Sequence, residues 1–368
     1  MRKIAVGMVG VANFGAARRA LLRRAEGFEL RVLYDRSPEA LAAACREEGA
    51  RAAGSFEEVI GDPGVEAVVI STGASSHADL AEAALRAGKH VFVEKPLCCN
   101  VAEAARLRRV QRETGLVVGM GHHRNDASPV VRLVRSLVAD GSLGKVAAYE
   151  ENTSHSGGFQ IRPGDWRGAA GLNPGGMLFQ CGVHALHTLQ GLFGPVTHVS
   201  AMFRDDVNPD TCTTDVAALT LRHAGGLVGT LNCYHVTAYC HELRVFGTKG
   251  NVYIDTLEQR AWYQRALYGP REPRVEVPVP TTPDAEVANV RAWHAAVCGQ
   301  GVADPDLEQG IAAVLPVFVA ERAAREQRAV ALAELAWGEP DEQAKPAPGA
   351  TPGVVVTRAA AAAARSGA

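Results

Sequence analysis

The chain has 368 residues, of which 47% are hydrophobic and 21% are charged, and its formal net charge is −2. This near-neutral charge excludes the basic surface of a nucleic-acid-binding protein and the polybasic patch of a membrane tether. No apolar run reaches the roughly 18 residues that a membrane-spanning helix needs. The eight cysteines form no Cys-x-x-Cys pair, so we expect a cytoplasmic protein with reduced thiols.

Short β-rich runs and helical stretches alternate along the first part of the chain. Ser37 supplies an N-cap ahead of Pro38 at the first helical position, and Ser55 and Asn100 each precede a glutamate at capping-box spacing. Strands that alternate with helices indicate βαβ units, and therefore a parallel sheet covered by helices, here over residues 1–122. The expected strands lie at residues 4–9, 30–34, 66–71, 90–93 and 116–119.

Beyond residue 145 the pattern changes to apolar–polar alternation, which is typical of half-buried strands in an antiparallel sheet. Helical stretches accompany these strands at 177–192, 287–298 and 307–328, so we expect residues 123–337 to form an α+β domain. Residues 338–368 are rich in Pro, Ala and Gly, and we expect a disordered tail there. The expected strands lie at 146–153, 196–203, 216–222, 227–235, 241–246 and 251–254, with hairpin turns at 223–226 and 247–250.

The first strand leads into a glycine-containing loop, residues 10–15 with the sequence GVANFG, which opens the first helix. In a dinucleotide fingerprint the first glycine permits the tight turn, and a small second residue lets the backbone approach a pyrophosphate. Ala12 takes this second place. A pyrophosphate would lie at the helix N-terminus, over Gly10, Ala12, Asn13 and Phe14. The alternative is a tight strand–helix turn that binds nothing.

Asp35 follows the second strand, twenty residues after Gly15, where a carboxylate binds the hydroxyls of the adenosine ribose. The alternative role for Asp35 is a helix cap at the surface. Arg36 leaves the choice between NAD and NADP open, since its side chain can lie over the adenine or pair with the 2′-phosphate of NADP. We favour NAD over NADP.

Residues 70–97 read ISTGASSHADLAEAALRAGKHVFVEKPL. This segment resembles the Gfo/Idh/MocA family, named for glucose–fructose oxidoreductase, inositol dehydrogenase and a rhizopine-catabolism protein. The matching pieces follow the family order and span most of residues 4–335, and they are specific for the family but not for a substrate. They are Ser71 and Thr72 with His77, AGKHV at 87–91, EKPL at 94–97, Trp166 with Arg167, Gly175 and Gly176 with His184, and FGTKG at 246–250.

The resemblance implies an N-terminal Rossmann domain that binds NAD(P), followed by an α+β domain with a large, mostly antiparallel open sheet through which members form dimers or tetramers. It implies an oxidoreductase that transfers a hydride between nicotinamide and a hydroxyl or keto carbon of a sugar, cyclitol or similar polyol. The family's catalytic lysine falls on Lys95, with a cis peptide bond to Pro96, and its catalytic histidine falls on His184. The resemblance carries cofactor contacts over to Ser71, Thr72, His77, Glu94 and Lys95.

The residue chemistry at Lys95 and His184 agrees with this implication. Oxidation of an alcohol needs a group that accepts the hydroxyl proton and a cation that stabilises the developing alkoxide. Histidine titrates near neutral pH, and lysine supplies a positive charge. On the expected helix, Gln180, His184 and His187 share a polar face, which we expect to line a cleft. The stripe that contains Cys181 is expected to face the core.

Gln180 stands where the family carries an aspartate, four residues before the histidine, and His187 stands where it often carries another. Glutamine cannot exchange a proton, but it can hydrogen-bond a substrate hydroxyl. We therefore expect Gln180 to contact substrate, and His187 either to contact substrate or to shuttle a proton. Further substrate contacts are expected at His123, Arg124, Trp166, Arg167 and His184.

A metal site is not expected, because His184 and His187 have no carboxylate or thiolate set at metal-ligand spacing. Two alternatives to a dehydrogenase stay open. One is a redox-neutral enzyme that cleaves or epimerises glycosides while NAD stays bound, and the other is a non-catalytic ligand-sensing regulator on the same fold. The presence of both Lys95 and His184 argues against the regulator.

Overall fold

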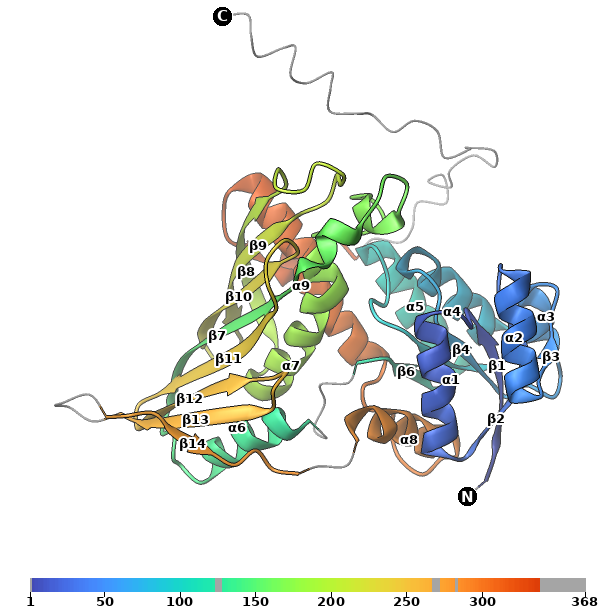
Figure 1. The fold of residues 1–368 in the computed structure, drawn as a ribbon, viewed down its shortest axis with the longest axis horizontal. Coiled ribbons are helices and arrows are strands. Elements are labelled where there is room, and N and C mark those ends of the chain that lie inside the picture. Colours follow the sequence, from blue (N-terminus) through green and yellow to red (C-terminus); the bar gives the residue numbers. More distant parts are fainter. Residues whose placement is uncertain (1, 123–127, 267–271, 282–283, 338–368) are drawn as a thin grey trace, which may run out of the picture. The chain divides into compact units, whose positions relative to one another are not determined.

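The computed structural model describes residues 2–122, 128–266, 272–281 and 284–337. The expected tail at 338–368 and the expected substrate contacts His123 and Arg124 lie outside these residues. Strands and helices alternate in the first part of the chain, and strands predominate in the second part, as the sequence predicts (Figure 1).

A six-stranded sheet in the order β3-β2-β1-β4-β5-β6 forms the first part of the chain, and all its strand pairs are parallel. The strand order reverses between β1 and β4, and a crevice for ligands opens at such a point at the carboxyl ends of the strands. The Rossmann-like parallel sheet predicted from the sequence is therefore confirmed. Its strands are β1 (Ile4–Val9), β2 (Phe28–Tyr34), β3 (Arg51–Ala52), β4 (Ala67–Ile70), β5 (His90–Val93) and β6 (Val118–Met120).

The connecting helices begin and end at the residues that the capping patterns predict. Ser37 Oγ accepts a backbone N–H at 3.2 Å with Pro38 at the first position of α2, and Ser55 and Asn100 cap the next two predicted helix starts in the same way. Gly49 ends α2 in the left-handed conformation, with φ 66°. The helices are α1 (Phe14–Ala25), α2 (Pro38–Glu48), α3 (Phe56–Gly61), α4 (His77–Arg86) and α5 (Val101–Thr114).

A nine-stranded sheet in the order β14-β13-β12-β11-β7-β10-β9-β8-β15 forms the second part. Its strand pairs are antiparallel except for β7 and β10, which are parallel. This mostly antiparallel sheet confirms the predicted fold class. Its strands are β7 (Val146–Ser154), β8 (Val196–Arg204), β9 (Val216–His223), β10 (Val228–Tyr234), β11 (Cys240–Gly247), β12 (Gly250–Asp255), β13 (Arg260–Arg265), β14 (Val275–Val277) and β15 (Val330–Ala331).

Helices α7 and α9 lie between the two sheets in Figure 1. The sequence patterns missed α6, β13 and β14 and the two-residue strands β3 and β15. The β14 sequence, Val-Glu-Val, alternates over only three largely exposed residues at the sheet edge, so its pairing with β13 decides its structure. No helix in the described part of the chain has the length and apolar character needed to cross a membrane. The helices are α6 (Pro129–Ala139), α7 (Val183–Phe193), α8 (Ala285–Val297) and α9 (Leu307–Glu326).

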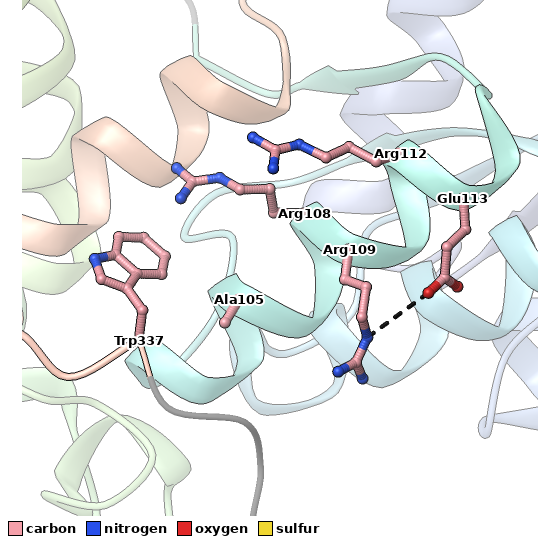
Figure 2. Close-up of a pocket in the computed structure, with 6 residues that line it drawn as sticks. All are labelled: Ala105, Arg108, Arg109, Arg112, Glu113 and Trp337. Atoms are coloured by element: carbon pink, nitrogen blue, oxygen red, sulfur yellow. Dashed lines mark ion pairs between the residues drawn. The ribbon is translucent and has the colours of Figure 1, made fainter.

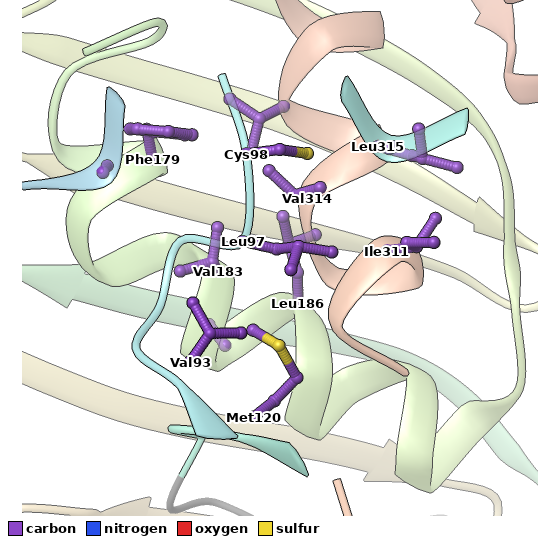
Figure 3. Packing of buried hydrophobic residues seen from close by; sticks show 14 of the residues in the cluster. Val93, Leu97, Cys98, Met120, Phe179, Val183, Leu186, Ile311, Val314 and Leu315 are labelled. Carbon is purple, nitrogen blue, oxygen red and sulfur yellow. The ribbon is translucent and has the colours of Figure 1, made fainter. Parts of the chain in front are cut away.

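One hydrophobic core joins the two parts. Figure 3 shows Leu97 and Met120 of the Rossmann part close to Leu186 of α7 and Ile311 of α9, all members of one buried cluster. Leu97 is only 1% exposed, and full burial of a leucine side chain stabilises a fold by about 1.5–3 kcal/mol. Because Leu97 comes two residues after Lys95, this packing anchors the segment that carries the lysine.

Candidate active site

The glycine loop after β1 forms a cradle that a side chain would fill. Gly10 has φ 78°, and a Cβ atom on it would lie 2.5 Å from the backbone oxygen of Ser71. A Cβ atom on Gly15 would lie 2.0 Å from the carbonyl oxygen of Gly10. The Oγ of Ser71 is buried, with no hydrogen-bond partner among the described residues. A bare backbone at a helix N-terminus beside an unused hydroxyl fits the phosphate and ribose groups of NAD.

Asp35, directly after β2, holds the same loop. Its Oδ2 accepts the backbone N–H groups of Val11 at 2.8 Å and Ala12 at 3.3 Å, and its Oδ1 accepts that of Ser37 at 2.9 Å. These three donors keep the carboxylate in one orientation at the carboxyl end of β2. Arg36 follows it with an exposed side chain. The structure thus gives Asp35 a role in shaping the loop besides the ribose contact expected from the sequence.

A cavity of about 190 Å³ opens where β4 and β5 end. Loops of the Rossmann part form one wall, and short turns of the second part form the other. Most of the lining residues were expected from the sequence, whereas Ala74, Pro96 and Cys181 were not expected at the site. The lining residues are Phe14, Ser71, Thr72, Ala74, Glu94, Lys95, Pro96, Trp166, Gln180 and Cys181.

Lys95 lines this cavity, and its ammonium is fixed by the opposite wall. The Lys95–Pro96 peptide bond is cis, which confirms the expectation from the family resemblance. The Nζ of Lys95 donates to the main-chain oxygen of Gln180 at 2.8 Å. Gln180 belongs to a π-helical turn, Leu178–Gly182, which precedes α7. A neutral carbonyl therefore positions the ammonium, which has three donors and keeps the others for a substrate oxygen.

Glu94 lines the cavity and forms an ion pair with Arg18 of α1. Both side chains are buried, and the guanidinium carbon of Arg18 lies 5.1 Å from the ring centroid of Phe92. Removing one partner of a buried ion pair costs about 3–5 kcal/mol, so this pair ties the segment that carries Lys95 to α1. The sequence analysis missed Arg18. The available signal was its place on α1, one turn after Phe14.

His77 is buried behind the cavity walls and bridges two of their segments. Its Nδ1 lies 2.6 Å from the Pro96 carbonyl oxygen, and its Nε2 lies 3.0 Å from the Thr72 carbonyl oxygen. Burial lowers the pKa of His77, so the ring is neutral near pH 7. A neutral imidazole has one N–H and donates to one of these carbonyls at a time. His77 therefore links the loop after β4 to the peptide that carries Lys95.

His184 and His187 of α7 gather with His122, which follows β6 directly. The Nδ1 atoms of His122 and His184 are 3.3 Å apart, and the rings of His122 and His187 stack with centroids 4.9 Å apart. His184 is 6% exposed and His187 is 8% exposed. The sequence analysis missed His122, although it begins the polar run in which His123 was singled out. The described residues contain no set of three or more His, Cys, Asp or Glu side chains placed to hold a metal ion.

Cys181 packs against the hydrophobic core, as expected, but it also lines the cavity beside Gln180, which was not expected. The prediction assumed a regular α-helix over 177–192. The π-helical turn has hydrogen bonds from residue i to i+5 and so contains one more residue per turn than that model. Adjacent residues of the turn therefore share one wall, whereas His184 lies in the histidine cluster beyond the turn.

Trp166 lines the cavity from a short 3₁₀ turn, Trp166–Gly168. Its neighbour Arg167 is paired instead with Asp165, whose Oδ2 lies 3.0 Å from the Arg167 Nε. The Asp165 carboxylate also accepts the Arg167 backbone N–H at 3.0 Å and so caps the turn. Trp166 and Arg167 were both predicted to contact substrate, but they have different surroundings. The Trp166 indole lines the cavity, and the Arg167 guanidinium binds Asp165 of its own loop.

A second hollow, of about 420 Å³, lies along α5 and contains no residue that the sequence analysis singled out (Figure 2). Arg108 forms two hydrogen bonds with Glu308 and lies 4.4 Å from the ring centroid of Trp337. Arg109 lies 3.9 Å from Glu113. Because none of the expected site residues lines this hollow, we assign the candidate active site to the cavity that contains Lys95.

Both parts of the chain match one family of known proteins. Residues 4–122 match the oxidoreductase family with an NAD-binding Rossmann fold, and residues 131–253 match the Gfo/Idh/MocA C-terminal domain. The dTDP-3,4-didehydro-2,6-dideoxy-alpha-D-glucose 3-reductase of Streptomyces violaceoruber is 31% identical over 314 residues, 82% of this chain and 88% of that protein. The chain belongs to the Gfo/Idh/MocA oxidoreductase family. It is therefore an NAD(P)-dependent dehydrogenase or reductase, as the sequence predicts.

Two further matches of this Gfo/Idh/MocA enzyme cover most of its length. The 1,5-anhydro-D-fructose reductase of Ensifer adhaerens is 27% identical over 297 residues, 78% of this chain and 86% of that protein. A levoglucosan dehydrogenase, solved in complex with NADH and levoglucosan, is 19% identical, with a TM-score of 0.81 over 91% of this chain and 100% of that chain. The second match bears on the fold alone.

Proposed function

We propose that this enzyme transfers a hydride between NAD and a hydroxyl or keto carbon of a sugar, cyclitol or similar polyol. The observation that carries the proposal is the Lys95 side chain in a cavity at the carboxyl ends of β4 and β5, fixed by the Gln180 carbonyl. Ligands of open parallel sheets bind at this edge. The substrate class is supported by relatives that are named as reductases of anhydrofructose and of a dTDP-linked sugar.

In the proposed mechanism, bound NAD supplies the carbon that accepts or returns the hydride. Lys95 places its ammonium against the substrate oxygen and stabilises the negative charge that develops there. His184 exchanges the hydroxyl proton, since an imidazole can accept a proton at one ring nitrogen and return it. The His122 ring beside it orients the His184 ring at Nδ1.

Gln180 and Trp166 are the proposed substrate-binding residues of the second wall. The Nε2 of Gln180 is buried and has no hydrogen-bond partner among the described residues. Leaving such a donor unpaired is unfavourable, so a substrate hydroxyl that accepts from it gains affinity. The indole of Trp166 lines the same cavity and offers an apolar face to a sugar ring.

The proposed preference for NAD over NADP rests on Asp35. Its carboxylate is held by three backbone donors, so it cannot turn away from an incoming 2′-phosphate. Two like charges at this distance repel each other, whereas ribose hydroxyls donate to the carboxylate. Arg36, the next residue in the chain, is a cation that could offset this repulsion.

We also propose that copies of the chain associate through the outer face of the nine-stranded sheet. Met202 of β8 is 81% exposed, and a large apolar side chain on a sheet face gains about 1.5–3 kcal/mol when it is fully buried. Light scattering on the purified chain measures the mass in solution. A monomeric mass at all concentrations contradicts the association.

The proposed reaction is tested by incubating the purified enzyme with NAD⁺ and a panel of sugars and cyclitols while the NADH absorbance band is followed. We expect at least one polyol to produce NADH, and His184→Ala to slow this by about 10²-fold or more. Gln300→Ala, in an exposed glutamine, is the control. Bound NAD that copurifies but gives no net NADH with any polyol contradicts the proposal and favours a redox-neutral reaction.

A further inference from the structure

Cys181 and His155 form a pair of side chains at the cavity that contains Lys95. Cys181 lines the cavity, and its Sγ lies 3.6 Å from the Nε2 of His155. A sulfur atom at this distance is within hydrogen-bonding range of a ring nitrogen. Neither residue is among the catalytic, cofactor-binding or substrate-binding residues expected from the sequence and the family resemblance.

The position of His155 follows from the parallel pairing of β7 and β10. His155 comes directly after β7, and its backbone N–H donates to the Tyr234 carbonyl oxygen of β10 at 2.9 Å. Its ring is then fixed by Gly157, whose backbone N–H donates to Nδ1 at 2.9 Å. A Cβ atom on Gly157 would lie 2.6 Å from the Cε1 of His155, so the close approach of this backbone requires glycine.

This bond decides which nitrogen of His155 carries the proton. Because Nδ1 accepts the N–H of Gly157, the proton of the neutral ring lies on Nε2, which faces the sulfur of Cys181. Burial lowers the pKa of His155, and the charge of Lys95 lowers it further, so the ring is neutral at neutral pH. His155 therefore donates an N–H to the sulfur and does not act as its base.

The other titratable groups around this pair do not change the protonation of His155. The ring of His235 lies 5.2 Å from that of His155, and burial lowers the pKa of His235 to about 4, so it is neutral as well. The ring centroid of Tyr239, which is largely exposed, lies 5.5 Å from that of His155. Lys95 and, beyond His235, Arg167 are the charges that act on these histidines.

We propose that Cys181 is a substrate-contacting residue of this cavity and that His155 is the positioning residue that holds its sulfur. This inference rests on the proposed function, since it takes the occupant to be a polyol. A thiol is small, apolar and a weak hydrogen-bonding group. It lies in the same wall as the strongly polar Gln180 amide. The Cys181 thiol would therefore contact a C–H group of the substrate, and the Gln180 amide would bind a hydroxyl on the neighbouring carbon.

Alkylation with iodoacetamide tests whether Cys181 faces the substrate. The sulfur attacks the methylene carbon, a C–S bond forms as the C–I bond breaks, iodide leaves, and the thiol proton goes to solvent. Peptide mapping of the intact enzyme follows each cysteine separately. Exposed Cys212 serves as the internal reference for free reaction, and buried Cys98 serves as the reference for protection.

We expect Cys181 to be alkylated in the free enzyme, and the reaction to slow about tenfold or more when NADH and a saturating polyol from the substrate panel are present. The rate at Cys212 should not change. An equal rate at Cys181 with and without these ligands overturns the contact, as does a Cys181 that is as unreactive as Cys98 in the free enzyme. Cys181→Ala should raise KM for the polyol about three- to tenfold with kcat little changed.

The rate of Cys181 alkylation at one pH tests His155 without any sugar, so it stays informative if no polyol is a substrate. His155→Phe removes the N–H that holds the sulfur, so the ratio of the Cys181 rate to the Cys212 rate should change about threefold or more. His155→Gln, whose side-chain amide can donate to the sulfur, should restore the wild-type ratio, and Gln300→Phe, at an exposed position, is the control and should leave it unchanged. If circular dichroism shows that His155→Phe is unfolded, Gly157→Ala, which keeps the histidine and displaces its ring, takes its place. An unchanged ratio in the folded variant overturns the positioning role.

Discussion

The two walls of the active-site cavity are built in different ways. In the Rossmann wall, Ser71 follows β4 directly and Glu94 follows β5 directly, so their places in space follow from their places in the sequence. In the opposite wall, Gln180 and Cys181 come from a π-helical turn that the sequence patterns read as a regular helix. The ends of buried parallel strands place side chains predictably, whereas an irregular turn decides which neighbouring residues face the ligand.

Lys95 joins the two walls, so its removal should have the largest effect. Lys95→Ala removes the cation from the cavity, and we expect kcat to fall by about 10²–10⁴-fold because groups of this kind contribute that much to catalysis. Binding of NADH, followed by fluorescence titration, should be nearly unchanged. Lys145→Ala, in an exposed lysine, is the control. Turnover of Lys95→Ala near that of the control would show that the Rossmann wall does not carry the chemistry.

The Rossmann wall is anchored by the hydrophobic core, so a substitution in that core, outside the cavity, should cause a large loss of stability. Leu97 is fully buried in the core shared by the two parts, so Leu97→Ala should lower the free energy of unfolding by about 2–5 kcal/mol. Leu257→Ala, in an exposed leucine, should change it by less than about 0.5 kcal/mol. Urea unfolding measures both. Equal effects of the two substitutions would contradict the anchoring role of the core.

Substitutions at Asp35, which follows β2, test whether a residue at a strand end also sets the preference for NAD over NADP. Asp35→Asn keeps an oxygen that can accept from the glycine loop but removes the charge, so we expect the ratio of NADP to NAD affinity to rise about tenfold. Asp35→Ala should weaken the binding of both cofactors, because the N–H groups of Val11 and Ala12 lose their acceptor. Isothermal titration with each cofactor measures the ratio. A wild-type enzyme that binds NADPH as tightly as NADH would instead assign the cofactor preference to Arg36.

Substitution of a side chain in the opposite wall should have the smallest effect on turnover, because Gln180 holds Lys95 through its main chain. Gln180→Ala leaves the carbonyl that accepts from Lys95 in place and removes only the amide, so we expect KM for the polyol to rise about three- to tenfold with kcat nearly unchanged. Gln300→Ala, in an exposed glutamine, is the control. Steady-state kinetics separate the two constants. A loss of kcat at unchanged KM would mean that the amide acts on the transition state.

Residues of the Rossmann part could be placed from the sequence because their signals are local. The spacing of Gly10 and Asp35 lies within one strand–helix–strand unit, and the caps at Ser37 and Asn100 each lie at the start of one helix. The structure bears out the elements that they predicted. The cis bond after Lys95 followed from the family resemblance and is present as well. Arg18 was missed because its partner Glu94 is distant in the sequence, so its place one turn after Phe14 could indicate the site but not the ion pair.

The sequence by itself determined the parallel sheet, the antiparallel sheet and the loop that fits NAD, because strand alternation, capping and glycine spacing act over a few residues. The family followed from the resemblance of longer segments to known proteins. Only the tertiary structure decided which side chains share the cavity. The π-helical turn placed Cys181 at the cavity that Lys95 also lines, and the parallel pairing of β7 and β10 brought His155 to its sulfur. The first result depends on an irregular turn and the second on contacts between segments far apart in the chain, and neither follows from strand alternation or capping.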